Sequence, residues 1–143
     1  MNFRQKKNLI QFVKYALVGV LNTLLTLGLI FLCKSVFGID QMLSNAIGYV
    51  AGFVNSFLWN KTWVFHSKKG YAKEAVKFFA GFLICYGIQF LTVWALSYKS
   101  PLEGFEINIL GFVLSGYGIA TLIGNVVYTL ANFVYNRTVT FRQ

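Results

Sequence analysis

Apolar residues dominate four long stretches of the chain, which run roughly over residues 12–33, 42–59, 75–96 and 107–135. A helix needs about 20 residues to cross the ~30 Å hydrocarbon core of a bilayer, so each stretch can form a transmembrane helix. The second stretch is the shortest and most polar, and the fourth is longer than a span requires. The pattern predicts an all-α, multi-pass integral membrane protein in which residues 1–143 form a single transmembrane domain.

The basic start of the chain, followed by an apolar run, resembles a signal peptide. The run from Phe12 to Cys33 is too long for a signal core, and no convincing small-x-small cleavage site follows it. We therefore expect an uncleaved first transmembrane helix.

Two pairs of similar segments divide the chain into repeats. The segment "QFVKYALVG" from Gln11 resembles "EAVKFFAGF" from Glu74. The segment "FLWNKTWVF" from Phe57 resembles "FVYNRTVTF" from Phe133, and the second repeat has the longer loop between its helices. Each repeat holds two predicted helices, which return the chain to its starting side. The sequence thus predicts two tandem two-helix hairpins of the same topology, related by an axis along the membrane normal.

The composition supports a membrane protein. Hydrophobic residues make up 57% of the chain and charged residues only 12%, whereas a soluble domain carries about 25% charged residues. The formal net charge of +9 would suggest nucleic acid in a soluble protein. In so apolar a chain, anionic lipid and oriented insertion explain it better, and we expect no nucleic-acid partner.

The basic residues gather on one side of the predicted spans. Of the 13 Lys and Arg residues, only Lys34 and Lys99 lie on the other side, together with Asp40, Glu103 and Glu106. Cationic loops remain in the cytoplasm. Both termini and the loop 61–77 are therefore expected to be cytoplasmic.

Polar residues recur at helical spacing along all four stretches and form one weakly polar stripe on each. Small residues on such a stripe can serve helix packing, whereas strongly polar groups that face a bundle interior usually mark a pathway. Both interpretations are open for the amide side chains on these stripes, which are Asn22, Asn45, Asn55, Gln89, Asn125 and Asn132.

Four cations stand at the cytoplasmic ends of the predicted helices: Lys14, Lys61, Lys77 and Arg137. In the repeat Lys14 matches Lys77 and Lys61 matches Arg137, and Asn60 and Asn136 precede the second pair. Such residues can simply extend to the interface. A symmetric ring of them would also suit an anionic headgroup, since Arg binds phosphate bidentately and Lys binds it as a compact charge.

Catalytic chemistry has no support in the sequence. No Asp or Glu lies inside a predicted span, and no paired carboxylates, Ser/His/Asp set, Gly-rich phosphate loop or metal-ligand cluster is found. His66 is expected to be a solvated surface residue. We expect no enzyme, catalytic residue, metal or cofactor, and no proton coupling through a buried carboxylate.

The chain resembles the GtrA-like family of small four-helix bacterial membrane proteins. The resemblance rests on "KYALVGVLNTLLTLGL", "NAIGYVAGFVNSFLWNKTWVF" and "NFVYNRTVTF", and it extends over nearly the whole chain. The first hairpin departs from the family pattern, because Ser56 separates Asn55 from Phe57, whereas Asn132 directly precedes Phe133.

The resemblance implies a location in the bacterial cytoplasmic (inner) membrane and a function in polysaccharide biosynthesis. It implies flipping of an anionic polyprenyl-phosphate-linked monosaccharide, such as undecaprenyl-phosphate glucose, to the outer leaflet, with glycosyltransferases of the same pathway as partners. Lys14, Lys61, Lys77 and Arg137 would then bind the phosphate. The groove for the sugar would be lined by Asn22, Asn45, Asn55, Asn60, Gln89, Asn125, Asn132 and Asn136.

Two other functions stay open. The chain could be a non-transporting membrane anchor or activator of a glycosyltransferase, or a small-solute or multidrug exporter. Four helices enclose little volume for a glycolipid head, so a parallel homodimer is also plausible.

Overall fold

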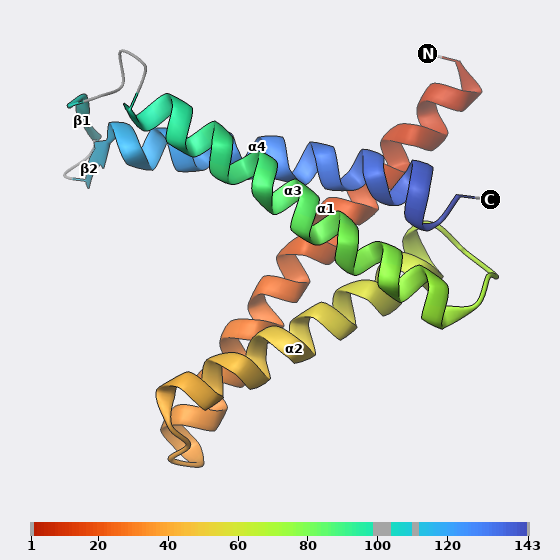
Figure 1. Cartoon of the computed structure of the whole chain (residues 1–143), viewed down its shortest axis with the longest axis horizontal. Helices are drawn as coiled ribbons and strands as arrows, with labels where there is room; N and C mark the ends of the chain where they lie inside the picture. The colour runs from red at the N-terminus through yellow and green to blue at the C-terminus, as the bar shows by residue number, and fades with distance from the viewer. Residues whose placement is uncertain (1, 99–103, 110–111, 143) are drawn as a thin grey trace. The chain divides into compact units, whose positions relative to one another are not determined.

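The structure, a computed structural model, describes residues 2–98, 104–109 and 112–142 (Figure 1). The chain divides into two compact units, unit 1 over Met1–Gly70 and unit 2 over Tyr71–Arg142. The boundary falls within the Lys-rich loop that separates the two predicted hairpins.

Unit 1 is a hairpin of two long helices. Helix α1 (Phe3–Phe31) continues into a π-helical segment, η1 (Leu32–Val36), and α2 (Gln41–Trp59) returns alongside α1 and continues into a second π-helical segment, η2 (Asn60–Val64). Asp40 fixes the start of α2, because its carboxylate accepts hydrogen bonds from the backbone N–H groups of Met42 at 2.8 Å and Leu43 at 3.3 Å.

Unit 2 contains a second helical hairpin and a small β-hairpin. Helix α3 (Tyr71–Tyr98) packs against α4 (Gly116–Tyr135), which continues into a π-helical segment, η3 (Asn136–Thr140). Strand β1 (Glu106–Ile109) pairs antiparallel with β2 (Phe112–Ser115), with Glu106 opposite Ser115. The strands lie at the end of the unit where α4 begins (Figure 1).

The prediction of a fourth helix over residues 107–135 is wrong at its beginning. Residues 106–109 and 112–115 form the two strands, and the helix starts at Gly116. Isoleucine, valine and phenylalanine favour a pleated strand, and an apolar run this short does not reveal its period. Ser115 then caps α4, because its hydroxyl accepts a hydrogen bond from the backbone N–H of Gly118 at 3.2 Å.

Among the described residues, three helical segments are long and apolar enough to cross a membrane: Gln5–Val36, Tyr71–Tyr98 and Gly116–Thr140. Helix α2 is not among them, since Gln41, Asn45 and Asn55 lower its mean hydropathy. Its 19 residues still span about 29 Å. That α2 also crosses the bilayer therefore stays a prediction.

The surface of the protein is also apolar, as expected for a membrane protein. Large apolar side chains such as Leu24, Val50, Phe90 and Val126 are 59–65% exposed. Exposed apolar surface on this scale is rare on a soluble monomer and is typical of helices that face lipid.

One aromatic contact occurs in both units. Tyr15 of α1 lies edge-on to Phe65, with ring centroids 6.4 Å apart, and Phe78 of α3 packs against Phe141 at 6.0 Å. Tyr15 and Phe78 hold the same position in the first pair of repeated segments, and Phe65 and Phe141 both end the second pair. In each unit the contact joins the residue after the π-helical segment to the first helix.

Candidate functional site

The two motifs "NKTWV" and "NRTVT" form the π-helical segments η2 and η3. In each of them the backbone makes one wide turn at the end of the preceding helix, α2 or α4. π-Helical turns are rare and often occur at functional sites. Both segments begin with a buried Asn, because Asn60 is 2% exposed and Asn136 is fully buried. The repeat seen in the sequence thus coincides with the same local backbone structure in both units.

The two buried Asn residues make equivalent hydrogen bonds. The Asn60 amide donates to the Ser56 carbonyl at 2.8 Å and to the Ser56 hydroxyl at 3.3 Å. The Asn136 amide donates to Asn132 Oδ1 at 3.1 Å. Each acceptor residue comes directly before the first Phe of its repeated segment, so Ser56, and not Asn55, is the counterpart of Asn132.

A polar chain continues from Asn136 into α4. The Asn132 amide donates in turn to the Tyr128 hydroxyl at 3.2 Å. Among the described residues, the buried Oδ1 atoms of Asn60 and Asn136 have no hydrogen-bond partner. A buried acceptor without a donor is unusual, so these two oxygens are where a donor from a ligand or water would be favoured.

The four predicted phosphate-binding cations lie in different surroundings. Lys14 and Lys61 belong to unit 1, and Lys77 and Arg137 belong to unit 2. Lys61 is only 2% exposed, and its ammonium group donates a hydrogen bond to the Lys69 carbonyl at 2.6 Å. Lys77 is exposed on α3, whereas Arg137 is half-buried in η3. Lys61 therefore also holds the loop that follows η2.

Lys14 lies in a basic pocket of unit 1. Its ammonium group is 5.1 Å from the centroid of the Trp63 ring, which is within cation–π range. The pocket has a volume of about 410 Å³ and is lined by Phe3, Lys6, Lys7, Ile10, Gln11, Lys14, Val64 and His66. We call it the basic pocket. Its lining combines three lysines with apolar side chains and contains no carboxylate.

Lys6, Lys7 and His66 line the basic pocket but were not among the predicted site residues. The spacing of Lys6 and Lys7 to Lys14 does place the three lysines on one face of a helix. No sequence signal brings His66 there, because the turn after η2 is set by its left-handed backbone, with φ 51°. This side chain is exposed, as expected, but it lines the basic pocket.

The amide side chains inside the hairpins bond mainly to one another. The Asn55 amide of α2 donates to Asn22 Oδ1 of α1 at 3.3 Å, and Asn55 Oδ1 accepts from the Trp59 indole at 3.1 Å. In unit 2 the Gln89 amide of α3 donates to Asn125 Oδ1 of α4 at 2.7 Å. These pairs join the two helices of each hairpin, as polar groups do inside membranes.

Asn45 and Glu74 are two further polar residues on the helices, and both lie near a helix start. Asn45 Oδ1 accepts from Gln41 Nε2 at 3.1 Å, near the start of α2 and away from η2. Glu74 stands in the first turn of α3 and is only 2% exposed, which the sequence did not indicate. Within the described ranges, no group of three His, Cys, Asp or Glu side chains could hold a metal ion.

Comparison with known proteins identifies the family. The family described as "GtrA/DPMS, transmembrane domain" matches residues 14–141, from Lys14 of the basic pocket to Phe141 after η3. The chain belongs to this family. The resemblance found in the sequence is thereby confirmed, and the matched region includes both π-helical motifs.

Three proteins from Listeria and Bacillus are similar to this chain. The chain is 27% identical to the cell wall teichoic acid glycosylation protein GtcA of Listeria innocua, over 94% of this chain and 87% of the relative. It is 26% identical to GtcA of Listeria monocytogenes, over 90% and 82%. It is 35% identical to the uncharacterized membrane protein YngA of Bacillus subtilis over 57% of this chain, and the match spans only 55% of YngA.

Proposed function

We propose that the chain translocates a polyprenyl-phosphate-linked monosaccharide from the cytoplasmic to the outer leaflet of the bacterial cytoplasmic membrane, without catalysing a reaction. The observation that carries the proposal is the basic pocket, in a chain whose relatives include two named teichoic acid glycosylation proteins. Glycosylation outside the cell requires an activated sugar there, and a lipid phosphate is a form in which a membrane protein can move it.

The topology that this function requires is part of the proposal. All four helices would cross the bilayer as two tandem hairpins, with both termini and the loop between η2 and α3 in the cytoplasm. The exposed apolar side chains of α2, with Tyr49 at 67% and Val50 at 65%, support a lipid-facing α2. The charge bias of the loops supports the orientation.

The basic pocket is suited to the head of such a lipid. Lys6, Lys7 and Lys14 would neutralise the phosphate, while the apolar wall would contact the first part of the tail. The Lys14 ammonium group lies over the face of the Trp63 ring, and this cation–π contact limits where its charge can lie. Arg137 and Lys77 would offer the corresponding charges in unit 2.

Movement of the sugar needs hydrogen-bond partners inside the membrane. The pairs Asn22–Asn55 and Gln89–Asn125 could exchange their mutual hydrogen bonds for bonds to sugar hydroxyls, because an amide both donates and accepts. The buried Oδ1 atoms of Asn60 and Asn136 would accept further hydroxyl protons. These exchanges would avoid an unpaired polar group in the hydrocarbon core.

Reconstitution tests the proposal. The purified protein, alone in liposomes, should move undecaprenyl-phosphate glucose between leaflets, as measured by the access of a membrane-impermeant glucose-oxidising reagent. Replacing Lys6, Lys7 and Lys14 by Gln should slow the movement at least tenfold. A control variant with Lys68→Gln and Lys73→Gln, which removes two positive charges outside the basic pocket, should retain the wild-type rate.

The same assay separates the other functions. If movement occurs only when a glycosyltransferase is added, the chain is an anchor or activator, and our proposal fails. We also expect the rate to be unaffected by a protonophore, with direction set by synthesis inside and consumption outside. Loss of movement with the proton gradient, together with its loss in Glu74→Gln, would instead support a proton-coupled exporter.

A further inference from the structure

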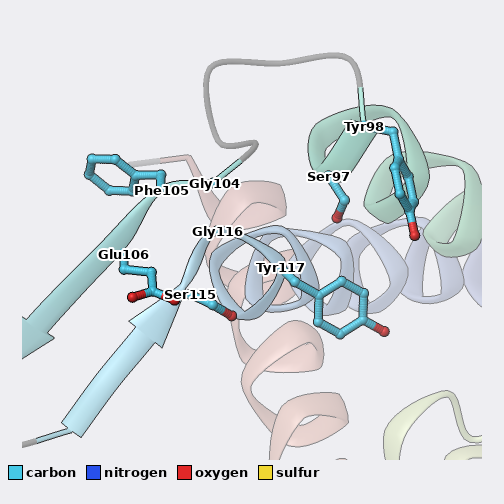
Figure 2. Close-up of a pocket in the computed structure, with 8 residues that line it drawn as sticks. All are labelled: Ser97, Tyr98, Gly104, Phe105, Glu106, Ser115, Gly116 and Tyr117. Carbon is cyan, nitrogen blue, oxygen red and sulfur yellow. The ribbon is translucent and has the colours of Figure 1, made fainter.

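A second pocket lies in unit 2, at the end opposite to η3. It is formed where α3 ends and α4 begins, beside the β-hairpin (Figure 2). Its volume is about 230 Å³, somewhat below the range of about 300–1,000 Å³ that drug-sized ligands occupy. It is lined by Ser97, Tyr98, Gly104, Phe105, Glu106, Ser115, Gly116 and Tyr117. We call it the distal pocket.

The side chains of the distal pocket offer hydroxyl and carboxylate groups next to aromatic rings. In Figure 2, Tyr98 and Tyr117 lie on one side of the opening, and Glu106 and Ser115 lie on the other. The tyrosines are 65% and 64% exposed, so their ring faces are available to a ligand. This combination fits a small polyol, whose C–H faces contact a ring while its hydroxyls bond to polar groups.

Two polar groups in the pocket favour a hydroxyl-bearing ligand over an anion. Glu106 is a hydrogen-bond acceptor when ionised, so it attracts hydroxyl donors and repels a phosphate. The Ser97 hydroxyl oxygen is buried and has no partner among the described residues, although a hydroxyl can both donate and accept. The distal pocket therefore carries a negative charge, whereas the basic pocket has three lysines and no carboxylate.

The distal pocket is one membrane thickness away from the motif of its own unit. Helix α4 separates the pocket at Gly116 from η3 at Asn136, and its 20 residues span about 30 Å. That length equals the hydrocarbon thickness of a bilayer. If η3 faces the cytoplasm, the distal pocket faces outward.

We infer that the distal pocket binds the neutral monosaccharide of the lipid that has reached the outer leaflet, with the phosphate held outside the pocket. The inference rests on the proposed function, because it assigns a subsite to the same substrate. The sugar would place one face on Tyr117 and donate hydroxyl protons to Glu106. The pocket would then select the sugar, whereas the basic pocket would recognise only the charged phosphate.

Direct binding tests the inference without transport. Full-length protein in nanodiscs would be examined by saturation-transfer NMR with the methyl glycosides of glucose, galactose, mannose and N-acetylglucosamine. At least one should give a signal that empty nanodiscs lack. Glu106→Gln should lower the affinity for that glycoside about tenfold, since it removes a charged acceptor but keeps the shape. Tyr117→Ala should do the same, whereas Tyr49→Ala, which removes an equally exposed tyrosine outside the pocket, should have no effect.

The outcomes separate the two proposals. Absence of any protein-dependent glycoside signal, or wild-type affinity in both Glu106→Gln and Tyr117→Ala, overturns the inference even where the wild type translocates the lipid. If the wild type binds a glycoside in the distal pocket but moves no lipid in liposomes, the proposed function fails while the sugar site stands.

Discussion

Gly48 of α2 lies against Ile30 of α1 so closely that a Cβ added at Gly48 would come within 2.5 Å of Ile30 Cγ1. Gly124 of α4 has the same relation to Val93 of α3, with 2.6 Å to Cγ2. The two glycines hold equivalent positions in the sequence repeats, and so do Ile30 and Val93. Both helical pairs therefore make their close approach at corresponding positions.

The first prediction concerns these glycines. Gly48→Ala and Gly124→Ala should each destabilise the protein by about 1–3 kcal/mol, because the new methyl group overpacks the helix contact. Gly19→Ala and Gly87→Ala have open space at the Cβ position and should not destabilise it. Unfolding in mixed micelles would measure all four variants. Equal stability of the Gly48 and Gly19 variants would contradict the close contact.

The second prediction concerns the hydrogen bond between Asn22 and Asn55. A double-mutant cycle of unfolding free energies with Asn22→Ala and Asn55→Ala should give a coupling free energy of about 0.6 kcal/mol. It should not exceed about 1.7 kcal/mol, the upper end for polar pairs between membrane helices. The same variants should slow lipid translocation if this amide pair also serves the sugar. A coupling near zero would show that the two side chains do not interact in the folded protein.

The helices could be predicted from the sequence, because long apolar runs have few alternatives inside a membrane. The amide stripes were also informative, since Asn22 and Asn55, and Gln89 and Asn125, meet across their hairpins. The pairing itself was not predictable, because helical spacing gives the face of a residue and not its depth relative to another helix. Ser56 illustrates this, since its place before Phe57 aligns it with Asn132 but does not show that both accept a hydrogen bond from the Asn four residues later.

Three other features could not be read from the chain. The β-hairpin of Glu106–Ser115 lies in a short apolar run that fits helix and strand equally well. The burial of Lys61 was not predictable, because the Lys69 carbonyl to which it donates is brought back to it by the turn after η2. The basic pocket is lined by His66, whose backbone is left-handed, a conformation that is uncommon for residues other than glycine and that no sequence pattern indicated.

The third prediction concerns topology. In a variant with Cys33 and Cys85 replaced by Ala, a cysteine at Ser67 should react with a membrane-impermeant maleimide only from the cytoplasmic side. A cysteine at Phe105, which is 44% exposed, should react only from outside. Labelling of intact cells and of inverted vesicles would measure both. Reaction of both positions from the same side would contradict a membrane crossing between them.

The fourth prediction separates the two motif cations. Arg137→Ala and Lys61→Ala should both abolish translocation, but they should differ in stability. Lys61→Ala removes the hydrogen bond to the Lys69 carbonyl and truncates a buried side chain, so it should destabilise the protein by about 1–3 kcal/mol. Arg137 is half-buried, so Arg137→Ala should affect transport more than folding. Arg137→Lys should restore only part of the rate, because it keeps the charge without the bidentate geometry.

Rates would be normalised to folded protein in the liposomes. Wild-type rates in both alanine variants would mean that these cations only anchor the helix ends, and the phosphate would then have to be bound by the basic pocket alone.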